Sequence, residues 1–243
     1  DTHGSLFGST RNVYDLERTA GGSSGGSGAA VSANFCTVGV GQEGLASIRR
    51  PAIWNGIAGM RPTAGLVSRT GVYAGWPMIH GSLGPMARTV TDLARLLDCM
   101  VGYDAEDPVT SRGVGHAPDS YAELVDDDAL KGARIGVLRE SMGWDSDPGS
   151  DDFDKVTEVF DRAVADVRTA GAEIVDPVVI PDLEALLAKR AGNAEDEEQS
   201  FKNYVAGSAN APFASRAEAM SSPLFAEVLQ VARRRWQSSR PPE

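Results

Sequence analysis

Residues 21–28 read Gly-Gly-Ser-Ser-Gly-Gly-Ser-Gly, and residues 29–40 continue as the apolar, compact stretch Ala-Ala-Val-Ser-Ala-Asn-Phe-Cys-Thr-Val-Gly-Val. A flexible linker would not pass directly into a sequence that forms a hydrophobic core. Dense glycine beside hydroxyl groups instead indicates a backbone that comes close to a reacting group, where a side chain would obstruct. The run therefore predicts part of a functional site inside a folded domain.

A second serine-containing segment, residues 41–52, reads Gly-Gln-Glu-Gly-Leu-Ala-Ser-Ile-Arg-Arg-Pro-Ala. A serine hydroxyl attacks a carbonyl carbon only when a base accepts its proton and hydrogen-bond donors stabilise the oxyanion that forms. The stretch from Gly44 to Ser47 can present consecutive backbone N–H groups directly before a hydroxyl. A lone serine in a glycine-rich turn is ordinarily a turn former. The order and spacing of two such segments instead favour nucleophilic catalysis.

Hydrophobic periodicity outside these segments predicts an α/β architecture, because helical and strand-like stretches alternate along the chain. Thr89 or Thr91 is expected to cap one helix, and Gly102 to end it. A longer helix lies between two short apolar segments, which predicts a parallel strand–helix–strand crossover. The other expected elements are helices from residue 25 or 27, from 150 or 151 to 171, and at 183–190, 195–206 and 223–236, strands at 36–40, 133–138 and 173–175, a turn at 41–47 and an acidic loop at 102–128.

The composition is that of an ordinary globular protein: of 243 residues, 42% are hydrophobic and 23% are charged. This length is enough to bury a sizeable core. The net charge of −11 argues against nucleic acid or an anionic membrane as a partner, since both require basic patches. No apolar run approaches the roughly 18 residues of a membrane span, and we expect a cytoplasmic protein.

Cysteine and histidine give no sign of a metal or redox site. Cys36 and Cys99 lie in apolar segments without the neighbours of a metal-binding motif, so we expect buried free thiols. His3, His80 and His116 are too scattered for a zinc site. The sequence therefore predicts no metal and no cofactor.

Four segments resemble the amidase signature family, both in sequence and in their order. Residues 21–31 are close to the defining motif of that family, and the other three are residues 41–52, 59–63 and 84–90. The resemblance is strong over residues 5–105 and less specific as far as residue 180. It implies an α/β fold, an α/β/α sandwich around a mixed β-sheet, incomplete in this chain. We expect a single amidase-type domain over residues 1–243, with a signature core at 1–105, a strand–helix–strand part at 106–180 and a helical substrate-side region at 181–243.

The resemblance also implies a Ser–Ser–Lys triad that cleaves amide-type C–N bonds. Ser47 would be the nucleophile, and Ser23, placed after a cis Gly22–Ser23 peptide bond, would bridge it to the lysine. The expected reaction is acyl transfer, in which Ser47 attacks a carbonyl, an amine leaves and water hydrolyses the acyl-enzyme. In the implied supporting roles, Ser24 orients the triad, Glu43 and Arg49 brace the nucleophile loop, and the backbone amides of Gly44, Leu45, Ala46 and Ser47 line the oxyanion hole.

Two departures from the family pattern fall in the nucleophile loop. Leu45-Ala46 stand where the family more often has Gly-Gly or Asp-Gly, and side chains there narrow the backbone angles available to the oxyanion hole. Gln42-Glu43 stand where the family often has Thr-Asp, so the carboxylate is kept with one more methylene.

A third departure concerns the base. The family's catalytic lysine lies well upstream of the glycine run, and a serine without a base is a poor nucleophile at neutral pH. The chain begins with Asp1 rather than Met, so we expect a piece of a longer protein, with the lysine not present in this chain. All four lysines here lie downstream and match no family position: Lys131, Lys155, Lys189 and Lys202.

The substrate is less well defined by the sequence. Tyr73, Trp76 and Met78 are candidates for an apolar pocket wall, although aromatic residues also fill ordinary cores. Small-molecule amides, carbamates (including urethane-type bonds) and ureas all share the carbonyl chemistry. Neither nucleic acid nor membrane is an expected partner, and an oligomer is compatible with the sequence. Three further aromatic residues could line the pocket or form buried helix faces: Phe201, Tyr204 and Phe225.

Other functions are compatible with parts of this pattern. Residues 22–26 match a G-x-S-x-G elbow, with Ser24 as nucleophile and His80 or His116 as base, but that elbow follows a strand and residues 14–20 do not resemble one. A phosphate-binding loop would need Gly-Lys-Ser/Thr after the glycines, and no lysine is present there, so this loop is excluded in that form. Two alternatives remain within the family: an amidotransferase A-type subunit that acts only in a complex, and a non-catalytic binding or structural homologue.

Overall fold

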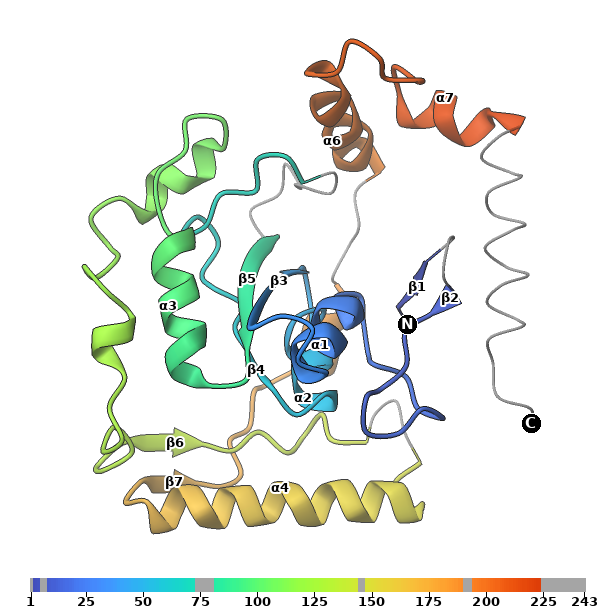
Figure 1. Ribbon diagram of the computed structural model, residues 1–243. Helices are drawn as coiled ribbons and strands as arrows, with labels where there is room; N and C mark the ends of the chain where they lie inside the picture. The colour runs from blue at the N-terminus through green and yellow to red at the C-terminus, as the bar shows by residue number, and fades with distance from the viewer. Residues whose placement is uncertain (1, 5–7, 73–80, 144–146, 190–193, 224–243) are drawn as a thin grey trace. The chain divides into compact units, whose positions relative to one another are not determined.

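The computed structural model describes residues 2–4, 8–72, 81–143, 147–189 and 194–223. The chain forms two compact units. The larger unit comprises Asp1–Leu124 and Asn193–Glu243, and the smaller unit comprises Val125–Gly192. Helices occur together with antiparallel and parallel strand pairs, as the α/β prediction required (Figure 1). The prediction of a single domain over residues 1–243 stays a prediction.

The sheet of the larger unit places the glycine-rich segments. Strands β3 (Val38–Glu43), β5 (Ser82–Ala87) and β4 (Ala58–Gly59) pair antiparallel in the order β3-β5-β4. Gly41 lies opposite Gly84 in the register of β3 and β5. A side chain at Gly84 would not fit, because its Cβ would lie 2.0 Å from the carbonyl oxygen of Met60. Close approach of the backbones therefore requires glycine here.

Short helices and a buried apolar cluster complete this part of the larger unit. Helices α1 (Gly25–Ser32) and α2 (Arg49–Trp54) pack on each other, and α3 (Val90–Met100) packs on β5 (Figure 1). The cluster consists of Ile48, Ala52 and Met86, with Ile57 packed against it. The remaining elements of this unit are β1 (His3–Gly4), β2 (Gly8–Ser9), the 3₁₀ helices η1 (Pro108–Gly113) and η2 (Ala122–Leu124), α6 (Ala194–Ala206) and α7 (Arg216–Ser221).

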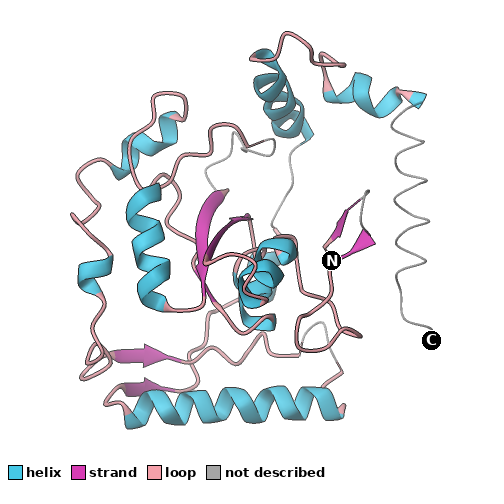
Figure 2. Ribbon diagram, in the orientation of Figure 1, coloured by secondary structure: helices cyan, strands magenta, loops and turns pink. Residues whose placement is uncertain are grey.

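The smaller unit contains the predicted crossover. Strands β6 (Arg134–Gly136) and β7 (Glu173–Val175) pair in parallel, and helix α4 (Asp151–Thr169) connects them and packs on β7 (Figure 2). Ser150 caps α4 by accepting a hydrogen bond from the Phe153 amide at 3.3 Å. Gly171, with φ +102°, follows the helix as expected. A short helix, α5 (Leu183–Ala188), completes the described part of this unit.

Several sequence predictions were wrong in detail. The strand predicted at 36–40 is β3 at Val38–Glu43, so the first three residues of the predicted turn at 41–47 are strand. Cys36 and Cys99 are free but exposed, not buried. Cys36 lies in the connection between α1 and β3, and Cys99 lies two residues beyond the buried Leu97, which turns it to the outer face of α3. The helix predicted at 223–236 lies almost wholly outside the described residues.

The described residues contain no helix that combines the length and the apolar character needed to cross a membrane.

Candidate functional site

Hydroxyl groups of the glycine–serine run fasten α1 to strand β3. The Ser24 hydroxyl accepts a hydrogen bond from the Gln42 amide at 3.0 Å and donates one to the Gln42 carbonyl at 3.3 Å. The Ser27 hydroxyl donates to the Val40 carbonyl at 2.9 Å. A Cβ on Gly41 would lie 3.0 Å from the Ser24 hydroxyl oxygen and 2.8 Å from Ile48. The glycine spacing on β3 thus makes room for the hydroxyls of α1.

The backbone joins the two serine segments directly. The Ser24 amide donates a hydrogen bond to the Ser47 carbonyl at 3.1 Å, which places the residue after Ser23 against the turn that carries Ser47. Ser23 is exposed, and Ser47, in the turn before α2, is half-buried. Among the residues that the structure describes, neither the Ser23 hydroxyl nor the Ser47 hydroxyl has a hydrogen-bond partner. Both hydroxyls are therefore available to a reaction partner.

The Glu43 carboxylate, at the end of β3, braces residues 44–49, the loop predicted to carry the nucleophile (hereafter the nucleophile loop). Its side chain is 0% exposed. One carboxylate oxygen accepts from the backbone amides of Ile48 at 2.7 Å and Arg49 at 2.9 Å. The other oxygen accepts from the Arg49 guanidinium at 2.7 Å, and that guanidinium also donates to the Leu45 carbonyl. The buried Glu43 carboxylate thus holds the loop through two backbone amides and through the Arg49 guanidinium.

The backbone amides predicted to line the oxyanion hole have no acceptor of their own. Glu43 accepts from the amides of Ile48 and Arg49, which follow Ser47. Within the described part of the chain, the amides at residues 44–47 donate to no protein group. Four successive N–H donors are therefore left beside the Ser47 hydroxyl, the kind of group that stabilises a developing oxyanion.

The peptide bond between Gly22 and Ser23 is cis, as predicted. Three side chains hold the backbone around it. The Thr2 hydroxyl donates to the Gly21 carbonyl at 2.8 Å and accepts from the Gly25 amide at 3.0 Å. The Arg50 guanidinium donates twice to the Gly22 carbonyl, from Nε at 3.2 Å and Nη2 at 2.9 Å. The third side chain is that of the fully buried Asn55, whose amide donates to the Ala20 carbonyl at 2.8 Å.

The sequence predictions did not include these three side chains. Thr2 lies about twenty positions before the glycine run, Asn55 lies in a segment read only as apolar, and Arg50 follows the arginine that the family motif singles out. Each donates hydrogen bonds to backbone carbonyls. No pattern of residue types in the sequence marks such a contact.

Other predicted residues do not join this site in the described structure. Tyr73, Trp76 and Met78 lie outside the described residues, as does His80. The segment before Ser24 consists of turns and an isolated bridge between Arg11 and Thr19 rather than a strand, so the G-x-S-x-G elbow is not formed. Of the lysines, Lys131, Lys155 and Lys202 each pair with a carboxylate three or four residues away. In the part of the chain that the structure describes, no group of three or more His, Cys, Asp or Glu side chains could hold a metal ion.

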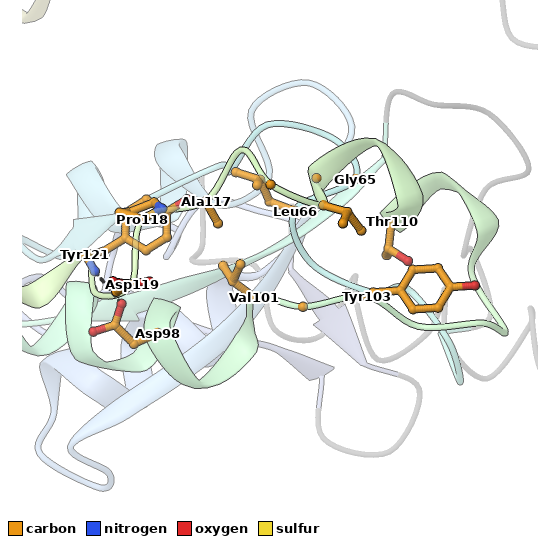
Figure 3. Close-up of a pocket in the computed structure, with 14 residues that line it drawn as sticks. Gly65, Leu66, Asp98, Val101, Tyr103, Thr110, Ala117, Pro118, Asp119 and Tyr121 are labelled. Atoms are coloured by element: carbon orange, nitrogen blue, oxygen red, sulfur yellow. Dashed lines mark hydrogen bonds between the residues drawn. The ribbon is translucent and has the colours of Figure 1, made fainter.

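Among the described residues of the larger unit, neither Ser23 nor Ser47 lines either of two cavities. The first, of about 430 Å³, extends from Asp98 and Tyr121 at one end to Tyr103 and Thr110 at the other (Figure 3). Asp98 accepts from the backbone amide of Tyr121 and the hydroxyl of Ser120, which lowers the pKa of its carboxyl group. The second cavity, of about 880 Å³, lies between residues 69–72, residues 106–109 and helix α6, and Tyr204 lines it.

A buried ion pair stands at the edge of the second cavity. The Arg69 guanidinium donates to both carboxylate oxygens of Asp107, at 2.8 and 2.6 Å. The hydrogen bonds from Arg69 lower the pKa of Asp107 below its ordinary value. Beside it, the hydroxyls of Ser68 and Thr70 donate to Asp104 and lower the pKa of that carboxyl group. These two carboxylates hold residues 68–70, directly before the predicted pocket-wall segment.

A family model and curated relatives match this chain. The family model Amidase matches residues 1–239. The A subunit of the glutamyl-tRNA(Gln) amidotransferase of Thermosynechococcus vestitus is 39% identical over 175 residues, which cover 72% of this chain and 34% of that relative. Its counterpart in Lactiplantibacillus plantarum is 41% identical over 181 residues, which cover 74% of this chain and 35% of that relative.

Solved structures show the same likeness over almost the whole chain. The native peptide amidase of Stenotrophomonas maltophilia matches 98% of this chain with a TM-score of 0.77 and 29% identity. The A subunit of the Thermotoga maritima glutamyl-tRNA(Gln) amidotransferase matches 96% with a TM-score of 0.63 and 27% identity. This chain spans 50% and 46% of those two chains. The chain belongs to the amidase signature family and has its α/β fold, as the sequence predicted.

Proposed function

We propose that the protein of which this chain is part is a serine hydrolase that cleaves amide-type C–N bonds through an acyl-enzyme on Ser47. The observation that carries this proposal is the hydrogen bond from the Ser24 amide to the Ser47 carbonyl, which brings the two serine segments together. The amides at residues 44–47, which donate to no group among the described residues, and the buried brace of Glu43 support it. Family membership gives the class of chemistry.

In the proposed reaction the Ser47 hydroxyl oxygen forms a bond to the carbonyl carbon of the substrate. Its proton passes to the Ser23 hydroxyl, which in turn gives its own proton to a base outside these 243 residues. The carbonyl oxygen becomes an oxyanion, which the backbone N–H groups at residues 44–47 stabilise. The C–N bond then breaks as the amine takes a proton, which leaves an ester on Ser47. Water attacks this ester and releases the acid, and Ser47 recovers its proton.

The proposed substrates are small-molecule amides, carbamates or ureas, since all present the same carbonyl to Ser47. Tyr73, Trp76 and Met78 are proposed to contribute apolar contacts to such a substrate. Hydrolysis of matched aryl amides, aryl carbamates and aryl ureas by the full-length protein would rank these three classes.

The proposed nucleophile is tested by substitution in the full-length protein. Ser47→Ala is expected to lower the hydrolysis rate of an aryl amide by about 10⁴-fold or more, because the group that forms the acyl-enzyme is lost. It should also abolish covalent labelling by a fluorophosphonate. Ser23→Ala is expected to lower the rate by about 10²- to 10⁴-fold, the usual range for a lost proton-transfer group. Unchanged hydrolysis after Ser47→Ala would rule out this nucleophile.

Ser111→Ala is the matched control for these variants. The Ser111 hydroxyl donates to the Pro108 carbonyl on the exposed surface of η1 and has no other hydrogen bond among the described residues. The same removal of a hydroxyl there is expected to leave both hydrolysis and labelling at the level of the unsubstituted protein. A loss of activity in this variant would show that a drop in rate does not identify the nucleophile.

A second candidate function is that of an amidotransferase component that acts in a complex. The two curated relatives at 39% and 41% identity are both A subunits of glutamyl-tRNA(Gln) amidotransferase. The full-length protein, purified from its native host, distinguishes the two functions. An autonomous hydrolase retains its activity on simple amides as a separate chain. A component of a complex has a larger native mass and hydrolyses glutamine only while its partner chains are present.

A further inference from the structure

One residue, Arg50 on helix α2, contacts the residues that directly precede both serines. Its backbone amide donates to the Ala46 carbonyl at 2.9 Å, and Ala46 precedes Ser47. Its guanidinium donates to the Gly22 carbonyl at 2.9 and 3.2 Å, and Gly22 precedes Ser23. The brace of the nucleophile loop is formed by its neighbour Arg49, so these contacts of Arg50 are separate from that brace.

The contact at Gly22 fixes the position of Ser23 through covalent geometry. A peptide group is planar, so an oxygen that is held in place restricts the positions that the nitrogen of the following residue can take. Gly22 has no side chain with which to resist a shift, and Ser23 is exposed. The two hydrogen bonds from Arg50 are therefore the side-chain contacts that hold this peptide group, and hydrogen bonds from a charged donor are the stronger kind.

The guanidinium of Arg50 is itself held in its orientation. It lies over the ring of Trp54, 5.6 Å from the ring centroid, on the next turn of the same helix. This separation lies within the range of a cation–π contact. A planar guanidinium stacked on a ring loses little freedom when its two nitrogens bond one oxygen. A lysine ammonium has neither this shape nor this stacking.

We propose that Arg50 is a positioning residue, which sets the placement of Ser23 relative to Ser47 by linking the Gly22 carbonyl to the Ala46 carbonyl. The inference rests on the proposed function, in which Ser23 accepts the proton of Ser47. In this role Arg50 acts through backbone carbonyls and takes no part in the bond changes. Its loss should slow proton transfer and leave substrate affinity unchanged, because a small displacement of a reacting group lowers the rate steeply.

Active-site titration of the full-length protein with a fluorophosphonate tests this role, because the titration separates the labelled fraction from the labelling rate. For Arg50→Ala we expect an unchanged labelled fraction and a labelling rate lower by about tenfold or more. On an aryl amide, kcat should fall by a similar factor with KM unchanged. Arg50→Lys should recover only part of the rate, and millimolar guanidinium ion should raise the rate of Arg50→Ala.

Arg95→Ala is the matched control, since Arg95 is an exposed arginine on α3 whose guanidinium pairs with Asp92. It should label at the unsubstituted rate and show no response to guanidinium. The inference would be overturned if the Arg50→Ala variant were labelled at the rate of the unsubstituted protein. It would also be overturned if a smaller fraction of the variant were labelled but that fraction reacted at the normal rate. Failure of the proposed function is a separate result, recognised because Ser47→Ala would then still be labelled.

Discussion

The serine-bearing loops of the larger unit and the crossover of the smaller unit are held by different kinds of contact. In the loops, Glu43 and Asn55 are fully buried polar side chains that bond to backbone groups. In the crossover, no residue of α4 is buried, and Val156 and Val159 on that helix are 65% and 56% exposed. The candidate site therefore depends on a few buried polar contacts between distant parts of the chain. The crossover depends instead on residues close together in the sequence, which form its helix and its strands.

The largest loss of stability is expected when the Glu43 side chain, which braces the loop, is removed. Glu43→Ala removes a buried carboxylate and leaves the amides of Ile48 and Arg49 without an acceptor. We expect a loss of about 2–6 kcal/mol in the free energy of unfolding, because each of the two backbone amides left without an acceptor costs about 1–3 kcal/mol. Denaturant unfolding of the full-length protein measures it. Glu43→Gln keeps a carbonyl acceptor and should lose less stability than Glu43→Ala. Equal losses in the two variants would show that the charge of Glu43 matters and that its role as an acceptor does not.

A smaller effect is expected from the paired arginines of the two units. Arg69 and Asp107 form a buried pair whose side chains are 7% and 6% exposed, so Arg69→Met leaves a buried carboxylate and should cost about 3 kcal/mol. Arg139 bonds to Asp176 and Asp161 at the surface of the smaller unit. Arg139→Met should cost clearly less, because solvent replaces the partner. Unfolding curves of the two variants are measured under identical conditions. Equal shifts of their midpoints would contradict the expectation that Arg69→Met loses more stability than Arg139→Met.

Acid should act on the larger unit through Asp107. Its pKa in the folded state lies below the ordinary value of 3.8, because Arg69 bonds the charged form. The stabilisation is therefore fully present above pH 3.8 and is lost as the pH falls through the lower, folded pKa. The difference in unfolding free energy between the unsubstituted protein and Asp107→Asn should shrink over that window, by at most about 1.4 kcal/mol per pH unit. A difference that stays constant would rule out this linkage.

The smallest effect is expected at helix caps, where the two units should behave alike. The Thr89 hydroxyl accepts from the Asp92 amide at the start of α3, and the Ser150 hydroxyl accepts from the Phe153 amide at the start of α4. Thr89→Ala and Ser150→Ala should each cost about 1 kcal/mol. Hydrogen exchange resolved by segment would show whether each loss stays within its own helix. A much larger loss at either cap would mean that the cap also fixes tertiary contacts.

Apolar spacing and capping residues, which lie close together in the sequence, were enough to predict the long helices and the crossover. Apolar spacing and the capping residues Thr89 and Ser150 predicted α3 and α4, and both caps are present in the structure. The family resemblance predicted the α/β fold, which the comparisons confirm, and the cis peptide bond at Ser23. These features depend on residues close together in the chain or on a motif.

Strand β5 and the contacts around Ser23 could not be predicted in the same way. Gly84 and Pro85 occupy the middle of β5, although glycine and proline normally argue against a central strand. Within this strand, the Met60 carbonyl oxygen approaches position 84 so closely that only glycine fits. Thr2 and Arg50 bond to carbonyl oxygens, which every residue carries, so the sequence does not indicate which ones they reach.

The Glu43 brace also determines the charge that a reacting substrate would meet. A buried carboxylate next to the nucleophile loop would ordinarily repel an oxyanion. Here its charge is balanced by Arg49, and its lone pairs are occupied by the two amides beyond Ser47. The local charge is close to neutral while the amides at residues 44–47 keep their hydrogens pointing at no protein acceptor among the described residues. If an oxyanion forms at these amides, as proposed, the neighbouring Glu43–Arg49 pair adds no net charge, and the contribution of that pair should vary little with ionic strength.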